Sequence, residues 1–84
     1  MANRIVMLLL RRKLKLKKYQ FFRFSEQKTN AVYYISDTNV MKLYRGKVTL
    51  SNVSVNHLLS ERCHIFIATP QQIRKAQKKR ESEQ

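Results

Sequence analysis

The sequence contains very little glycine, proline or cysteine, and each shortage removes a class of protein. A chain with one glycine, Gly46, has no glycine-rich loop whose backbone could wrap a nucleotide phosphate. A chain with one cysteine, Cys63, cannot form an intrachain disulfide, which excludes the small secreted domains that disulfides hold together. The lone cysteine favours the cytoplasm or another reducing compartment. With one proline and no flexible linker, the 84 residues predict a single domain, 1–84.

Acidic residues are scarce as well. Five Asp and Glu stand against 18 Lys and Arg, which gives a formal net charge of +13 at pH 7. Repulsion on this scale opposes compaction unless an anionic partner offsets it, so the charge predicts a polyanionic partner. Nucleic acid is the first candidate, an anionic membrane surface the second and an acidic protein surface the third. Since paired carboxylates are hardly available and no phosphate-loop, nucleophile-elbow or zinc-protease motif occurs, we expect a protein that is not an enzyme.

The positive charge is concentrated at the two ends of the chain. Residues 1–24 carry eight cations and no acid, and residues 71–84 carry five cations beside two acids, whereas residues 25–70 carry five cations against three acids. Surface ion pairs cannot account for an excess of one sign, so both ends are candidate phosphate-binding patches. The first basic patch comprises Arg11, Arg12, Lys13, Lys15, Lys17, Lys18 and Arg23, and the second comprises Arg74, Lys75, Lys78 and Lys79.

Aromatic side chains and cations are interleaved in KKYQFFRF, residues 17–24. In a strand, successive side chains point to opposite faces, so one face is apolar and the other combines aromatic rings with cations. The second face either packs beneath another layer of the protein or stacks on the bases of single-stranded nucleic acid, and both interpretations stay open. The stacking candidates are Tyr19, Phe21 and Tyr34, with Arg23 beside them.

A first hairpin is predicted around the polar segment QKTN, residues 27–30. With this loop, Phe22 lies opposite Ile35 and Phe24 opposite Tyr33. These four side chains form an apolar and aromatic set on one face of the hairpin.

A second hairpin is predicted by VMKLY-RG-KVTL, residues 40–50. Gly46 occupies the second turn position, where a positive φ is often required. Apolar residues then face apolar ones and polar residues face polar ones, as a half-buried ribbon needs. A short helix that begins at Asp37 or Thr38 and ends at Gly46 is the rival interpretation. The predicted pairs are Leu43 with Val48, Met41 with Leu50 and Lys42 with Thr49.

The last third of the chain predicts a strand and a helix. CHIFIA, residues 63–68, is almost entirely apolar and rich in strand formers, so we expect it to be the central strand. A basic helix is predicted over 70–80, because Thr69 is a good N-cap and Gln72 completes a capping box with it. Residues 81–84 form a tail. Before this region, the sequence predicts a strand continuation at Val53 and Val55 and a short turn or helical piece around Leu58 and Leu59.

The basic N-terminal segment, residues 1–18, is ambiguous. Its KLKLK alternation favours a strand with Leu14 and Leu16 on one face. Its apolar run of six residues, IVMLLL, is too short to span a membrane, and its Arg content leaves organellar targeting open. A helix is the alternative, with one stripe formed by Ile5, Leu8, Leu9, Arg12 and Leu16.

Metal and cofactor sites are not expected. One cysteine and two histidines cannot supply the four ligands of a structural zinc site. Cys63 and His64 lack a third orienting group, so we expect Cys63 to be a small buried apolar residue.

The sequence therefore predicts a small α+β domain with a mainly antiparallel sheet, built from two hairpins and a central strand at 63–68, and a basic C-terminal helix. The function we expect is non-catalytic nucleic-acid binding, with RNA favoured over DNA, as a structural ribonucleoprotein subunit or a small regulator. The alternatives are a small inhibitor or adaptor of phage or plasmid type that docks on an acidic protein, and an N-terminal amphipathic helix that lies on an anionic membrane.

Overall fold

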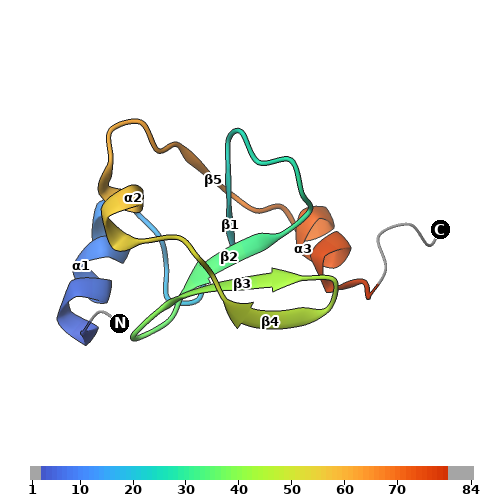
Figure 1. Ribbon diagram of the computed structural model, residues 1–84, viewed down its shortest axis with the longest axis horizontal. Coiled ribbons are helices and arrows are strands. Elements are labelled where there is room, and N and C mark those ends of the chain that lie inside the picture. The colour runs from blue at the N-terminus through green and yellow to red at the C-terminus, as the bar shows by residue number, and fades with distance from the viewer. Residues whose placement is uncertain (1–2, 80–84) are drawn as a thin grey trace.

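Within residues 3–79, which the computed structural model describes, five antiparallel strands form one sheet and three helices pack around it (Figure 1). The elements are α1 (Arg4–Lys13), β1 (Phe22–Phe24), β2 (Val32–Ile35), β3 (Val40–Tyr44), β4 (Lys47–Leu50), α2 (Val55–Leu59), β5 (Ile65–Ile67) and α3 (Pro70–Gln77). The strand order across the sheet is β4-β3-β2-β1-β5. This architecture confirms the predicted α+β class and the mainly antiparallel sheet.

The β3–β4 hairpin has the register that the sequence predicts. Met41 lies opposite Leu50, and Leu43 lies opposite Val48. Arg45 and Gly46 both have positive φ, at 53° and 77°, so the turn is of the mirror-image kind that fits the twist of a hairpin. A Cβ on Gly46 would lie 2.9 Å from the carbonyl oxygen of Gln77, so the close approach of the α3 end also requires glycine there. The rival short helix is wrong.

The β1–β2 hairpin forms with a register two residues away from the predicted one. Phe22 lies opposite Tyr33 rather than Ile35. The loop is longer than the predicted QKTN, and the side chain of Gln27 organises it by donating to the carbonyl oxygens of Thr29 and Ala31. A shift by an even number of residues keeps every side chain on its face, so the predicted division of the two faces holds although the pairs were wrong.

The apolar segment CHIFIA is an edge strand rather than the central one. Strand β5 pairs with β1 alone, and Phe66 and Ile67 are 63% and 56% exposed. Ile65 and Cys63 pack against the larger core, and Ala68 after β5 is buried in the smaller one. The central strand is β2, which pairs with β1 on one side and with β3 on the other, and an apolar run carries no information about that order.

The N-terminal segment is a helix, so the favoured strand assignment was wrong. Asn3 caps α1 by accepting a hydrogen bond from the backbone N–H of Val6, and the helix ends where Lys15 takes a φ of 58°. Two backbone bonds close this end, from Leu16 N–H to the oxygen of Arg11 and from Lys15 N–H to the oxygen of Arg12. This pattern is a Schellman motif, and it turns the chain back so that Leu16 is buried.

Two apolar cores lie on opposite faces of the sheet. The larger one contains Phe22 and Ile35 beneath α1 and α2, and the smaller one contains Val32 and Leu43 beneath Ala76 of α3. The buried members of the larger core are Met7, Leu10, Leu16, Phe22, Ile35, Val40 and Leu58. Both sheet faces are thus partly covered, each by different helices.

Helix α3 begins with the predicted capping box. The hydroxyl of Thr69 accepts from the N–H of Gln72, whose side chain accepts in return from the N–H of Thr69. Helix α3 ends at Gln77 instead of Arg80, and Arg80 and the predicted tail 81–84 lie outside the described residues. The short helical piece is confirmed as α2, whereas the predicted strand continuation is wrong because Val55 begins that helix.

The left-handed position at the end of α1 predicts a stabilising substitution. Lys15→Gly removes a conformational cost of roughly 1–2 kcal/mol, partly offset by the larger entropy of glycine in the unfolded chain. We expect the free energy of unfolding to rise by about 1 kcal/mol in urea titrations. The control Lys13→Gly, inside the helix, should lower it by up to about 1 kcal/mol, and a loss of stability in Lys15→Gly would contradict the Schellman assignment.

Candidate nucleic-acid interface

The three predicted stacking residues lie together on one face of the sheet. The ring centroids of Phe21 and Tyr34 are 5.4 Å apart, and those of Tyr19 and Tyr34 are 5.9 Å apart, both edge to face. Together with Met41 and Val48 they line a surface hollow of about 560 Å³. We call this feature the aromatic hollow. Its lining is mostly apolar, and Tyr19 is half exposed at its rim.

A tight turn before β1 positions Tyr19. The N–H of Lys17 donates to the side-chain oxygen of Gln20, and the N–H of Gln20 donates back to the carbonyl of Lys17. Tyr19 has a φ of 59°, a left-handed conformation that costs a non-glycine residue roughly 1–2 kcal/mol. Strain of this kind is frequent at functional sites, where a side chain has to be held in one place.

Helix α3 covers only part of this sheet face. Ala76 and Ile73 pack on Val32, Leu43 and Phe21, and these contacts form the smaller core. The aromatic hollow lies on the same face, where the helix does not reach. The sheet face is therefore divided between a core beneath α3 and an open aromatic surface beside it.

Arg23 supports a loop next to this face. One of its terminal nitrogens donates to the carbonyl oxygen of Thr29 at 2.7 Å. Its Nε is buried and has no hydrogen-bond partner among residues 3–79. Arg23 is opposite Phe66 on β5, so the structure places it toward the other edge of the sheet from Met41 and Val48.

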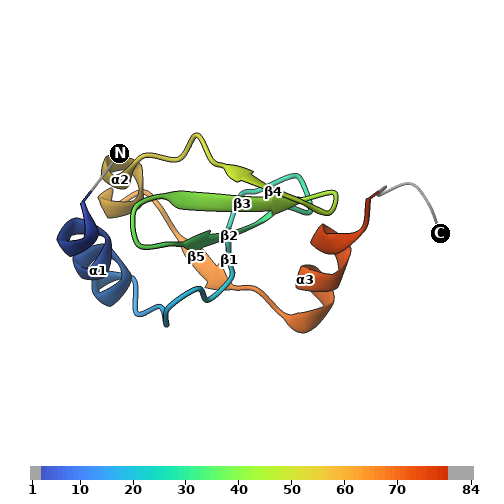
Figure 2. The same ribbon diagram turned by 90° about the horizontal axis from the view of Figure 1, so that it is seen from below.

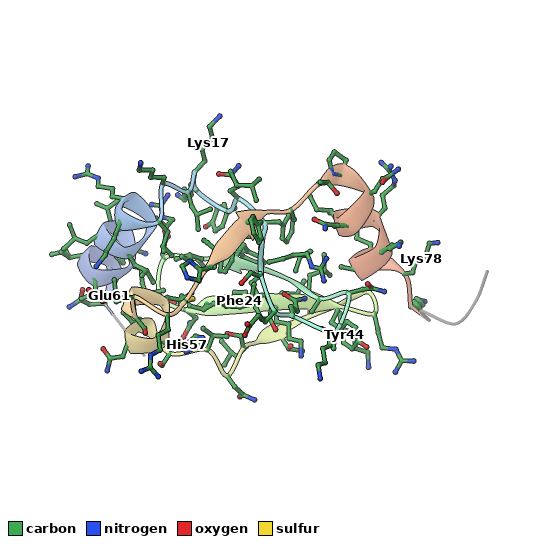
Figure 3. The ribbon with its side chains drawn as sticks, turned by 90° about the horizontal axis from the view of Figure 1, so that it is seen from above. Lys17, Phe24, Tyr44, His57, Glu61 and Lys78 are labelled. Carbon is green, nitrogen blue, oxygen red and sulfur yellow. The ribbon has the colours of Figure 1, made fainter. Side chains whose placement is uncertain are left out.

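The first basic patch follows the end of α1 and the segment that leads to β1. Arg11 is half-buried, and the other lysines and arginines of this segment are exposed. Lys17 projects away from the protein (Figure 3). Lys18 lies 5.3 Å above the ring of Tyr19 and 4.0 Å from the carboxylate of Asp37. Cations at the end of α1 also interact favourably with the helix dipole. The exposed members are Arg12, Lys13, Lys15, Lys17 and Lys18.

The second basic patch lies at the opposite end of the molecule, on α3 and the residues after it (Figures 1 and 2). Its predicted members Arg74, Lys75, Lys78 and Lys79 are all exposed. Three of them line a surface hollow of about 710 Å³ together with Thr69 and two glutamines.

A further group of cations joins this patch, and the sequence analysis missed it. Lys42, Arg45 and Lys47 on the β3–β4 hairpin line a surface hollow of about 490 Å³ with Lys79 and Tyr44. We call these five residues, the three hairpin cations with Tyr44 and Lys79, the hairpin cluster. Lys42 lies 5.3 Å and Arg45 5.9 Å from the centre of the Tyr44 ring. A hydrogen bond from Gly46 N–H to the carbonyl of Ala76, 2.9 Å long, brings the hairpin tip to the end of α3.

The predicted strand pairing of the β3–β4 hairpin pointed to the hairpin cluster, whereas the count of charged residues did not. The predicted pairing already placed Lys42 opposite Thr49 on the polar face of the hairpin. The count of charges in residues 25–70 hid this group, because the balancing acids lie elsewhere in the fold. Only the packing of α3 against the turn adds Lys79.

Cys63 and His57 both line another surface hollow, with Phe24 and Arg62. Burial raises the pKa of the Cys63 thiol, which is opposite to the direction that an activated cysteine needs. Among the described residues, no three His, Cys, Asp or Glu side chains are grouped so that they could hold a metal ion. No helix within residues 3–79 has the length and apolarity to cross a bilayer.

Comparisons with known proteins give no relative. No family model matches the chain, and neither a curated protein nor a solved structure is similar to it.

Arg45 allows fold stability to be separated from binding. In Arg45→Asn, asparagine fits the positive φ better than arginine and the loss of the contact with Tyr44 costs about 0.5 kcal/mol, so we expect stability to stay equal or rise by about 0.5 kcal/mol. We expect affinity for RNA to fall several-fold in fluorescence anisotropy titrations. Arg62→Asn, which removes the same charge outside the hairpin cluster, should change affinity much less. Equal losses in both variants would mean that only net charge matters.

Proposed function

We propose that this protein binds nucleic acid without catalysing a reaction, and that RNA is its preferred ligand. The observation that supports this proposal most is the aromatic hollow, which is open on the sheet face between α3 and the turn at Tyr19. It offers ring faces and edges beside cations, which is the combination that unpaired bases and their phosphates require.

The charges of the protein are available to a ligand. Between residues of the described part of the chain, the only ion pair is Lys18 with Asp37, at 4.0 Å. The cations of the second basic patch and of the hairpin cluster are therefore not neutralised by acids of residues 3–79. Binding of phosphates to these cations would release condensed counterions from the nucleic acid and so provide affinity that does not depend on base sequence.

RNA suits this arrangement better than DNA. RNA-binding proteins that read little sequence contact the phosphates of the A-form helix, and they stack unpaired bases of loops and bulges on aromatic side chains. The two basic patches can contact a duplex backbone, and the aromatic hollow can accept a neighbouring unpaired base. Such a ligand is typical of structural ribonucleoprotein subunits and small RNA-binding regulators.

The open edges of the sheet support a second candidate, a small inhibitor or adaptor that docks on an acidic protein. All four residues of β4 are exposed, and β5 exposes Phe66 and Ile67 at the other edge. An extended segment of a partner could add to either edge. Lys47 on β4 is a charge of the kind that discourages strand addition, which makes this candidate weaker.

A salt titration tests the proposal. Binding of the full chain is measured to an RNA stem–loop, duplex RNA, single-stranded DNA, duplex DNA and an acidic protein. We expect the stem–loop to bind most tightly, with a negative log–log slope that corresponds to several phosphates. The triple variant Lys13→Ala, Lys15→Ala, Lys17→Ala should bind more weakly and reduce the slope by about two to three.

Two outcomes of this titration would oppose the proposal. If every nucleic acid dissociates at a salt concentration below the physiological one, the positive charge must serve another anionic partner. Tighter binding to the acidic protein than to any nucleic acid would favour the inhibitor or adaptor candidate.

The aromatic hollow is tested separately by Tyr19→Asn. Asparagine tolerates the left-handed φ of this position, so the fold should be kept while the ring at the rim is removed. We expect the stem–loop affinity to fall by about tenfold, which corresponds to the 1–3 kcal/mol of one base–aromatic stack. Phe66→Thr removes a similarly exposed ring outside the hollow and should leave affinity unchanged. Equal affinities for both variants and the original protein would exclude stacking at Tyr19.

A further inference from the structure

The outer face of α1 is apolar, although the helix already contributes its inner face to the core. Met7 and Leu10 are 2% and 1% exposed in the larger core, whereas Ile5 is 69%, Leu9 56% and Leu8 39% exposed. These three residues occupy positions i, i+3 and i+4, so they form one continuous stripe along the helix. These residues belong to the stripe that the sequence suggested for a helix, and they face away from the protein, whereas its last member, Leu16, lies past the end of α1 and is buried.

This stripe is surrounded by positive charge. Arg12 lies one helical turn beyond Leu8 on the same face, and Arg4 and Lys13 flank it. The helix contains no acid, and the first acid of the chain is Glu26. An exposed cluster of three large aliphatic side chains is unusual on a monomer and marks an interaction surface.

The charge and the apolar stripe together restrict what can cover this face. Nucleic acid offers phosphates but no aliphatic surface to a helix that lacks aromatic side chains. A second copy of the chain would offer an apolar face, but each copy carries a formal charge of +13 and repels the other. The partner has to be both anionic and apolar over an area as large as the helix.

We propose that α1 lies on an anionic lipid bilayer, with Ile5, Leu8 and Leu9 inserted between acyl chains and Arg4, Arg12 and Lys13 on acidic headgroups. Interfacial helices combine an aliphatic face with lysine and arginine in this way. A cation near an anionic leaflet adds to the binding, so the basic residues after α1 contribute as well. Helix α1 lies at the end of the molecule remote from α3, where a flat surface can reach it (Figures 1 and 2).

A bilayer fits this helix better than an acidic groove on a protein. Among the apolar residues that dominate protein interfaces, Trp and Tyr are enriched and Leu is under-represented, and the exposed apolar residues of α1 are aliphatic. The stripe is also separate from the aromatic hollow, whose lining comes from the turn before β1 and from strands β2 to β4. The apolar side chains of the two proposals are therefore different, whereas the cations Arg12 and Lys13 belong to both.

The test is co-sedimentation of the full chain with vesicles of phosphatidylcholine alone and of phosphatidylcholine mixed with phosphatidylserine. The variant is Ile5→Gln, Leu8→Gln, Leu9→Gln, since glutamine keeps the helix propensity and removes the aliphatic stripe. The control is Leu50→Thr, which removes an aliphatic side chain of similar exposure from β4, outside the lining of the aromatic hollow. Each protein is also titrated with the RNA stem–loop at the same salt.

We expect the original protein to bind the mixed vesicles and to bind phosphatidylcholine at least tenfold more weakly. The triple glutamine variant should lose at least tenfold in partition to the mixed vesicles and keep its RNA affinity, while the β4 control keeps its partition. Unchanged partition of the triple variant would show that charge alone holds the protein on the vesicles and would overturn the proposal. Absence of vesicle binding with intact RNA binding would overturn it too, and would redirect α1 to a groove on an acidic protein.

Discussion

The burial of Phe22 is the contact on which the arrangement of this protein depends. Its side chain is fully buried on the short strand β1, where it packs 5.7 Å from Phe24 and 6.0 Å from Tyr33, measured between ring centroids. Met7 of α1 and Leu58 of α2 belong to the same core, which joins both helices to the sheet. Because strand side chains alternate, burial of Phe22 on one face directs the neighbouring side chains to the other face, where the aromatic hollow lies.

The high positive charge of the protein opposes folding, and two small apolar cores provide the stabilisation. The smaller core has only four buried residues, and two of them are alanines. Repulsion between cations weakens the fold. Ion pairs with acids offset little of this repulsion, because one ion pair is formed within residues 3–79. An anionic ligand that contacts both basic patches would stabilise the folded protein by mass action, which connects the proposed function to the stability of the chain.

Local patterns predicted the fold where the interaction is local, and failed where it is not. The β3–β4 register and the capping box of α3 depend on residues that are neighbours in sequence, and both were predicted correctly. The alternation of Leu14 and Leu16 suggested a strand, but both residues follow the end of α1 and the chain reverses between them, at Lys15. The exposure of Phe66 at a sheet edge depends on strand order, which no apolar run encodes. The division into faces survived these errors because the first hairpin slipped by an even number of residues.

The sequence alone determined the sign of the charge, the antiparallel hairpins, the capped basic helix and the face that carries Tyr19, Phe21 and Tyr34. These follow from composition, from a side-chain period of two and from turn and cap residues, all of which act over short distances. Tertiary structure decided which parts of each face stay open. It placed α3 over only part of the aromatic face, joined the hairpin cluster to the end of α3, and turned the aliphatic stripe of α1 outward. Each of these depends on contacts between segments far apart in the chain, which compete for the same apolar surface, and a local pattern cannot show which segment covers it.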